Sequence, residues 1–173
     1  IPDSLKNPSL RASYLVAHYW DNFGFADSLQ YMNAPVEIEQ ALVNYIDLFR
    51  LVPAEEAEQS LIRVMRQAEE TRSGVYFFYN AFEKYLYDLG SPMRNENFFI
   101  PVLRQMVASG KVGKEDKIRP EMLLKSVWKN RVGSQAADFT YVMADKTRHR
   151  LQTLDAPVTL LLFFDPDCNE CHQ

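Results

Sequence analysis

The sequence predicts a mainly helical protein of 173 residues with a short β-rich segment toward its C-terminal end. Two observations lead to this fold class. Apolar residues recur at helical spacing through most of residues 10–130, and the pattern changes at Val132-Gly133 to short runs of β-branched and aromatic residues. Because short loops join the helical stretches, we expect about six helices whose sequential neighbours pack antiparallel.

The first three helices are predicted at roughly residues 10–20, at 36–51 and from Pro53 to Ala68. The second has apolar residues at helical spacing, among them Ile38, Leu42 and Phe49. Pro53-Ala54-Glu55-Glu56 is a strong helix start, because proline suits the first turn and acidic side chains meet the positive end of the helix dipole. Glu55 and Glu56 are therefore interpreted as solvated helix ends.

The remaining helices are predicted at residues 75–89, 97–109 and 120–130. Ser73-Gly74 is expected to break the chain before the first of these, and Pro120 to open the last. Two aromatic runs are candidates for function. His18-Tyr19-Trp20 offers a ligand-binding cluster, but we expect a packed corner of the core. Tyr76-Phe77-Phe78-Tyr79 exceeds one helical face, which would allow some rings to line a groove, but we expect contact with a neighbouring helix or domain.

The C-terminal segment is predicted to contain two strands and a turn. Phe139 to Val142 is short and β-rich, and Asp145-Lys146-Thr147 is typical of a turn. The continuous apolar run from Val158 to Phe164 is expected of a strand that is covered on both faces. The domain boundary is placed near residues 131–134, which gives a helical domain at 1–131 and the beginning of an α/β domain at 132–173.

Composition excludes several functions. The formal net charge of −4 and a pI of about 5.4 argue against nucleic acid as a partner, since a face that neutralises many phosphates is not expected on such a chain. No apolar run approaches the roughly 20 residues that span a bilayer. Two cysteines are too few for a scaffold held together by disulfides.

The candidate catalytic residues are these two cysteines, Cys168 and Cys171. They form a Cys-x-x-Cys motif directly after the apolar run. At a helix N-terminus the first thiolate would be stabilised, so that Cys168 attacks a partner's disulfide and Cys171 resolves the mixed disulfide. The neighbouring acids Asp165, Asp167 and Glu170 oppose the thiolate, and predict that the pair acts as a reductant.

Three other interpretations of the motif compete. A structural zinc site needs four ligands, and no second cysteine pair is present. Cys168 to His172 has the Cys-x-x-Cys-His pattern of c-type haem attachment, but haem attachment does not explain the preceding strand. The third alternative is a pair of inert cysteines. We expect thiol–disulfide chemistry with no metal and no cofactor.

The C-terminal residues resemble bacterial envelope thioredoxin-like proteins, the thiol–disulfide oxidoreductases of that compartment. The resemblance rests on Gly133 to Thr140, Asp145, Leu154, Leu160 to Phe164 and the cysteine pair. It implies a periplasmic or other extracytoplasmic location, protein thiols and disulfides as partners, and a redox role for Cys168 and Cys171. We expect the thioredoxin-like domain to be truncated after this motif, and the strand Val158–Phe164 to self-associate or dock.

The helical part resembles a helical domain of unknown function that precedes thioredoxin-like domains in some Gram-negative envelope proteins. Residues 14–23, 84–88 and 91–96 carry this resemblance. The resemblance implies a neighbouring envelope oxidoreductase domain and no reaction of the helical part itself. We expect the helical domain to position partners or to dock the parent protein. The alternative, from another functional class, is a binding or structural module without catalytic activity of its own.

Overall fold

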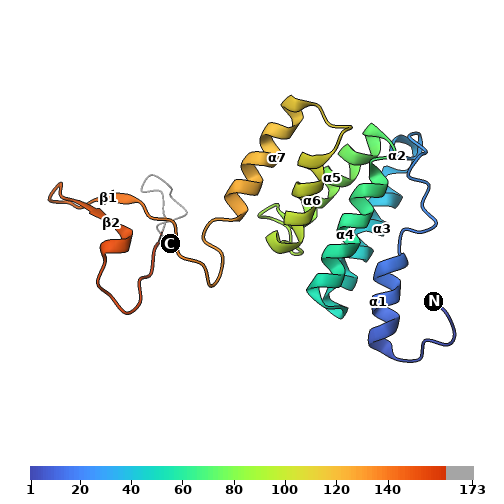
Figure 1. The fold of residues 1–173 in the computed structure, drawn as a ribbon, viewed down its shortest axis with the longest axis horizontal. Coiled ribbons are helices and arrows are strands. Elements are labelled where there is room, and N and C mark those ends of the chain that lie inside the picture. Colours follow the sequence, from blue (N-terminus) through green and yellow to red (C-terminus); the bar gives the residue numbers. More distant parts are fainter. Residues whose placement is uncertain (163–173) are drawn as a thin grey trace. The chain divides into compact units, whose positions relative to one another are not determined.

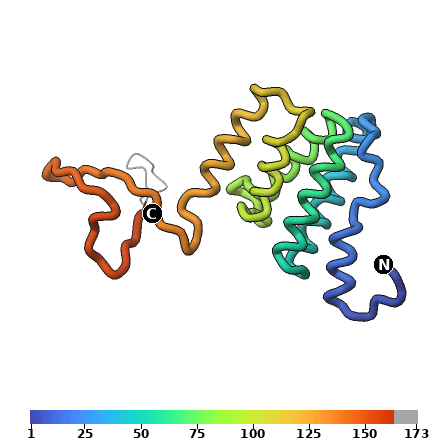
Figure 2. Tube along the Cα trace, viewed as in Figure 1, coloured from blue at the N-terminus to red at the C-terminus, as the bar shows by residue number. Residues whose placement is uncertain are grey.

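The computed structural model describes residues 1–162, and its course is shown in Figures 1 and 2. The chain divides into two units, of which the first spans Ile1–Arg131 and the second begins at Val132. The described helices of the first unit are α1 (Pro8–His18), α2 (Gln30–Asn33), α3 (Pro35–Asp47), the 3-10 helix η1 (Leu48–Leu51), α4 (Ala54–Ala68), α5 (Arg72–Leu86), α6 (Glu96–Ala108) and α7 (Lys114–Val127). The predicted mainly helical class is confirmed.

The helices of the first unit form a layered array. Helices α1, α4, α6 and α7 contact one another in succession, and α3 and α5 pack behind this row (Figure 1). Helix α5 contacts α3, α4 and α6, so it occupies the centre of the unit. Helix α1 is therefore one end of this row, in which it contacts α4.

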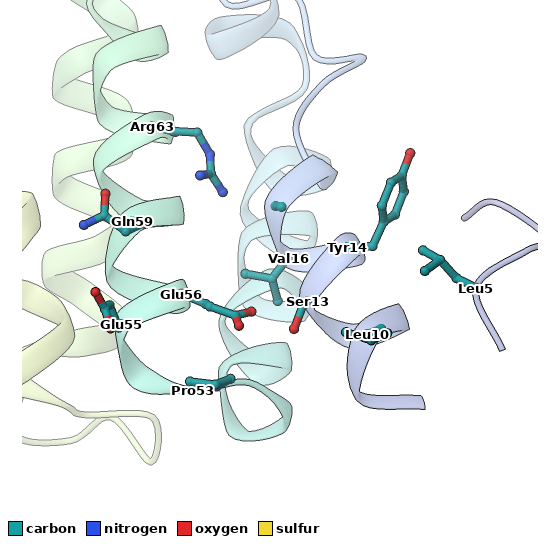
Figure 3. A pocket seen from close by; sticks show the side chains of 11 residues that line it. Leu5, Leu10, Ser13, Tyr14, Val16, Pro53, Glu55, Glu56, Gln59 and Arg63 are labelled. Carbon is teal, nitrogen blue, oxygen red and sulfur yellow. The ribbon is translucent and has the colours of Figure 1, made fainter. Parts of the chain in front are cut away.

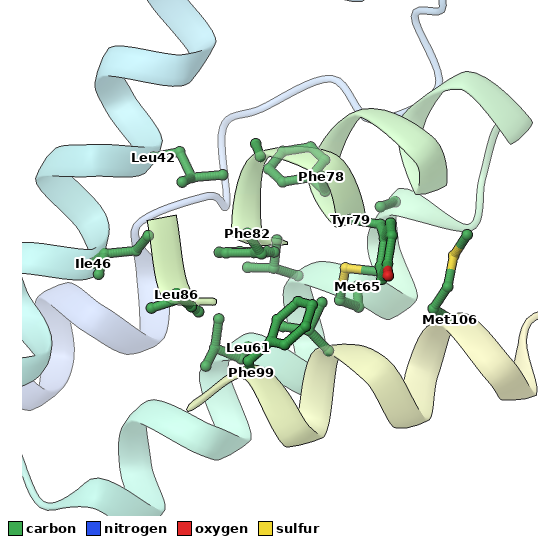
Figure 4. Packing of buried hydrophobic residues seen from close by; sticks show 14 of the residues in the cluster. Leu42, Ile46, Leu61, Met65, Phe78, Tyr79, Phe82, Leu86, Phe99 and Met106 are labelled. Carbon is green, nitrogen blue, oxygen red and sulfur yellow. The ribbon is translucent and has the colours of Figure 1, made fainter. Parts of the chain in front are cut away.

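The core is built around α5 and is rich in aromatic side chains. Phe78, Phe82 and Leu86 of α5 are fully buried, and Figure 4 shows them between residues of α3, α4 and α6. The Phe78 and Trp20 rings form a T-shaped pair with 5.2 Å between their centroids. Trp20 is itself buried and Tyr19 packs partly buried against the core, as predicted, whereas His18 is exposed.

Two predictions around α5 are wrong. The helix runs through Ser73-Gly74 instead of starting after it, because the Thr71 hydroxyl accepts a hydrogen bond from the Gly74 amide and caps the helix there. Gly74 is needed for close approach, since a Cβ would lie 2.7 Å from the Ala68 carbonyl oxygen. At its other end α5 stops at Leu86, which leaves Leu89 exposed.

The predicted start of the last helix at Pro120 is also wrong. Helix α7 begins at Lys114, so Pro120 lies inside it and is buried. Proline suits the first turn because its missing N–H has no partner there, but a helix can continue through a proline at the loss of one hydrogen bond. The short helix α2 was not expected, because four residues are too few to show a helical period.

The second unit contains one described hairpin. Strands β1 (Thr140–Val142) and β2 (Arg148–Arg150) pair antiparallel with Tyr141 opposite His149, followed by the 3-10 helix η2 (Leu151–Thr153). The predicted turn lies between the strands, with Lys146 in the left-handed region at φ 67°.

The predicted strand Val158–Phe164 is wrong for the part that the structure describes. Residues 158–162 are not in a strand, and Leu160 is 92% exposed. A strand requires a neighbour for its backbone groups, and β1 and β2 pair with each other in the described sheet. Phe163 and Phe164 lie outside the described residues.

Candidate functional site

The predicted redox pair, Cys168 and Cys171, lies outside the described residues. The sites that the structure describes are therefore in the helical unit and in the hairpin. One of them is a hollow of about 690 Å³ along α1 and α4, shown in Figure 3. We refer to it as the α1–α4 groove.

The α1–α4 groove has a largely apolar floor. Leu10, Val16 and Ala17 contribute from α1, and Pro53 contributes where α4 begins. Val16 is buried, whereas Leu10 is 56% exposed. An apolar side chain of that size on the rim of a hollow is available to cover a ligand or a partner.

Local capping interactions shape the groove at its N-terminal edge. The Asn7 side chain accepts hydrogen bonds from the Ser9 amide at 2.9 Å and the Leu10 amide at 3.2 Å, which starts α1. Arg11 Nη1 donates to the Leu5 carbonyl at 2.9 Å, so the leading segment is held and Leu5 lines the groove.

Two consecutive buried hydrogen bonds join the two walls of the groove to α3. The Tyr45 hydroxyl donates to Ser60 Oγ at 2.6 Å, and the Ser60 hydroxyl donates to the Val16 carbonyl at 2.8 Å. Tyr45 and Ser60 are both buried, and burial raises the pKa of Tyr45. The hydrogen bonds fix α1, α3 and α4 relative to one another, so the groove is preformed.

Two opposite charges extend over this floor. Glu56 and Arg63 both point from α4 toward α1, whereas Glu55 and Gln59 extend on the other side of α4 (Figure 3). Seven residues along a helix correspond to a rise of about 10 Å. Within residues 1–162 neither Glu56 nor Arg63 forms an ion pair with another side chain. The α1–α4 groove thus has an anionic end and a cationic end.

The sequence did not single out these two residues as a pair. Glu56 was interpreted as a solvated helix end, and Arg63 carried no motif. The available signal was their separation of two helical turns, which places them on one face of α4. Only the packing of α1 beside that face makes it a groove wall.

Contacts of Trp128 and Arg131 hold the C-terminal end of the helical unit in place. The Arg131 guanidinium lies 4.5 Å from the Trp128 ring centroid, and that of Arg104 lies 5.3 Å from it. Arg131 also donates to Asn97 Oδ1 of α6 at 2.6 Å. These contacts fasten the last residue of the helical unit to α6, next to the point where the second unit begins.

The hairpin is closed at its base by Asp138. Its carboxylate accepts hydrogen bonds from the Gln152 amide at 3.1 Å and from Arg150 Nε at 2.6 Å. The Gln152 amide and then Arg150 hold the pKa of Asp138 below its usual range. The contacts are local, so they fix the shape of the hairpin without requiring a buried core.

Residues 1–162 contain neither a candidate metal cluster nor a candidate membrane span. No group of three or more His, Cys, Asp or Glu side chains there is arranged to hold a metal ion. No helix in the same range is long and apolar enough to cross a membrane.

The chain is similar to a protein family and to a solved structure. The model of the family described as "Domain of unknown function (DUF5106)" matches residues 1–130. The crystal structure of a thioredoxin-like protein from Bacteroides caccae superposes with a TM-score of 0.89 and is 38% identical in sequence. The match covers 99% of this chain and 61% of that protein. No curated protein matches the chain.

Proposed function

We propose that this chain, which belongs to the DUF5106 family, supplies the partner-positioning helical domain and the redox cysteines of a thiol–disulfide oxidoreductase of the bacterial envelope. The observation that carries the proposal is the similarity to a thioredoxin-like protein over 99% of the chain. The Cys-x-x-Cys motif after an apolar run supports the same chemistry.

The proposed reaction is a two-step exchange. The Cys168 thiolate attacks one sulfur of a partner's disulfide, and the partner's other sulfur leaves as a thiolate. Cys171 then attacks Cys168, which releases the partner as a dithiol and leaves Cys168 and Cys171 joined. The partner gains two electrons, and a dithiol reductant must regenerate the pair.

The helical unit supports the proposal through its architecture. It has its own buried core, a preformed groove on one side, and a C-terminal end fastened to α6 by Arg131. A rigid domain that binds a partner raises the partner's effective concentration at a tethered reactive group. We propose this tethering as the contribution of the helical domain to the exchange.

Trapping of mixed disulfides in the full-length protein tests the redox proposal. Cys171→Ser should accumulate a disulfide between Cys168 and a protein partner, because the resolving thiol is missing. Cys168→Ser should accumulate no mixed disulfide. This variant should also fail to catalyse the reduction of insulin by dithiothreitol. Insulin reduction that survives loss of both cysteines would contradict the redox proposal.

The acidic residues around the motif indicate the direction of the proposed redox reaction. We propose that the pair is a reductant, with a potential closer to about −270 mV than to about −120 mV. Equilibration of the full-length protein with glutathione buffers measures this potential. The location can be tested separately, because an extracytoplasmic pair in intact cells is alkylated by a thiol reagent that does not cross the inner membrane.

The second candidate is a helical binding module without activity of its own. It is favoured by the family match, which covers residues 1–130 and therefore the helical unit. The two candidates predict different results for the cysteine variants. If the chain is only a binding module, the variant with serine at both Cys168 and Cys171 still binds the partner. The unmodified protein then catalyses no thiol–disulfide exchange.

The exposed apolar residues that precede the cysteines support a further partner. Val158, Leu160 and Leu162 are each more than four-fifths exposed. We propose that residues 158–162 mediate self-association of this 173-residue chain when nothing else covers them. Sedimentation velocity should show dimers that Leu160→Ser with Leu162→Ser removes, and a strictly monomeric chain would contradict the proposal.

A further inference from the structure

We propose that the α1–α4 groove binds one amphipathic helix of a partner protein, with an apolar face against Leu10 and Val16 and opposite charges facing Glu56 and Arg63. This inference rests on the proposed function in one respect, because it gives the partner-positioning domain its docking surface. The docking itself requires no thiol chemistry, so the two can fail separately.

The walls of the groove favour a helix over an extended peptide. Both walls are α-helices whose backbone N–H and C=O groups bond within each helix. An extended peptide would find no backbone partners there, whereas a helix satisfies its own backbone groups. Groove recognition by a strand therefore requires an open sheet edge, which α1 and α4 do not offer.

The spacing of the wall residues also fits a helix. Leu10, Ser13 and Ala17 recur at intervals of three and four on α1, and form a ridge along the groove. Glu56 and Arg63 lie two turns apart on the facing side of α4. A third helix can lay its own ridge between two such rows, as helices do throughout globular proteins.

The charges specify the partner further. Glu56 and Arg63 are separated by two turns of α4 and point into the groove, without ion-pair partners in residues 1–162. A bound helix with a basic and an acidic residue two turns apart would pair with both. Charges on the rim of an apolar interface discriminate between partners and fix orientation. A small anion is a poorer ligand, since the Glu56 carboxylate would repel it from the anionic end.

The test uses the 173-residue chain and two synthetic helical peptides, each labelled with a fluorophore. Both carry leucines at helical spacing. One has a lysine in its first half and a glutamate two turns later, and the other has these two charges exchanged. Fluorescence anisotropy measures each affinity. The unmodified chain should prefer one peptide by about tenfold, which corresponds to roughly 1.4 kcal/mol.

Exchange of the two groove charges provides the decisive variant. In Glu56→Lys with Arg63→Glu the preference should reverse, because the anionic and cationic ends have changed places. The matched control is Arg66→Glu with Glu69→Lys, which exchanges charges at the C-terminal end of α4 outside the groove and should leave the preference unchanged. Leu10→Lys should weaken the binding of both peptides, because it replaces an apolar contact on the rim of the groove with a charge.

Three results would overturn the inference: no binding of either peptide, equal binding of both, or a preference that the groove exchange leaves in place. Far-UV circular dichroism confirms that each variant is folded. The redox proposal is judged separately by reduction of a small disulfide with the full-length protein, which the groove exchange should not alter. If the peptides do not dock but thiol–disulfide activity is retained, only this inference is contradicted. If thiol–disulfide activity is absent but the peptides dock as expected, only the redox proposal is contradicted.

Discussion

The helical unit and the hairpin that follows it are stabilised in different ways. Among the described residues, every buried hydrophobic side chain lies between Val16 and Val127. In residues 132–162 no residue is fully buried, although Asp138, Tyr141 and Leu151 are partly buried. The hairpin depends instead on its backbone ladder and on local hydrogen bonds to Asp138 and Asp145.

This difference indicates where the free energy of unfolding resides. Burial of large apolar side chains contributes about 1.5–3 kcal/mol each, whereas exposed ion pairs contribute roughly 0–1 kcal/mol. An isolated two-stranded hairpin is marginally stable at best. The stability of the chain is therefore expected to be that of its helical unit, and substitutions in the two regions should have unequal effects.

Truncation of a central aromatic residue should show the largest effect. Phe78 is fully buried and contacts Trp20 and Phe25, so Phe78→Ala should lower the free energy of unfolding by about 3–5 kcal/mol. Tyr141→Ala in the hairpin should change it by less than about 0.5 kcal/mol. Urea unfolding followed by far-UV circular dichroism measures both. Similar losses for the two variants would contradict the comparison.

Gly74→Ala should have the next largest effect. The new Cβ would lie 2.7 Å from the Ala68 carbonyl oxygen and 2.9 Å from the Tyr31 hydroxyl, so the backbone must shift at a cost of about 1–3 kcal/mol. Gly110→Ala is the control, since nothing lies within 4 Å of its Cβ position. Thermal melts that place both variants at the same midpoint would show that Gly74 is not tightly enclosed.

Loss of the buried hydrogen bonds that join Tyr45, Ser60 and Val16 should lower the free energy of unfolding by a comparable or smaller amount. Ser60→Ala leaves the buried Tyr45 hydroxyl and the Val16 carbonyl without that partner, at a cost of about 1–3 kcal/mol. Tyr45→Phe should cost less, because Ser60 can still donate to Val16. The order of the two variants in urea unfolding is the informative result, and the reverse order would show that the hydrogen bond to Val16 is dispensable.

The smallest predicted effect is a pH dependence in the helical unit. The Glu39 carboxylate accepts hydrogen bonds from Lys84 and from the Tyr85 hydroxyl, and these hold its pKa below the usual value. A lowered pKa stabilises the fold above the ordinary glutamate pKa, and this contribution is lost as pH falls through the folded-state pKa. Glu39→Gln should remove that part of the pH dependence. Asp138→Asn in the hairpin should leave the slope of global stability against pH unchanged, although the pKa of Asp138 is also lowered.

The same contrast explains which elements could be predicted from the sequence. The stripes that include Leu42, Leu61 and Phe78 predicted helices and core residues, because a helix that buries one face must repeat apolar residues with its own period. The hairpin turn at Asp145–Thr147 was also predictable, since turn chemistry is local. These elements need little information from elsewhere in the chain.

The remaining features depend on residues distant in sequence. Gly74 was interpreted as a break because the closeness of Ala68 and Tyr31 is not visible in a linear pattern. Pro120 was placed at a helix start because a buried proline inside α7 has no distinct signal. The α1–α4 groove requires α1 to pack beside the face of α4 that carries Glu56 and Arg63. The Cys168–Cys171 pair remains a prediction from the motif and its similarity to redox proteins.

Native-state hydrogen exchange of the 173-residue chain tests the central contrast most directly. The amides of α4, α5 and α6 should exchange only through global unfolding, and should share one free energy that Phe78→Ala lowers. The amides of β1 and β2 should exchange much faster and should not respond to that substitution. Equal protection of the hairpin and α5, lowered together by Phe78→Ala, would contradict the account by showing that the two regions unfold as one cooperative unit.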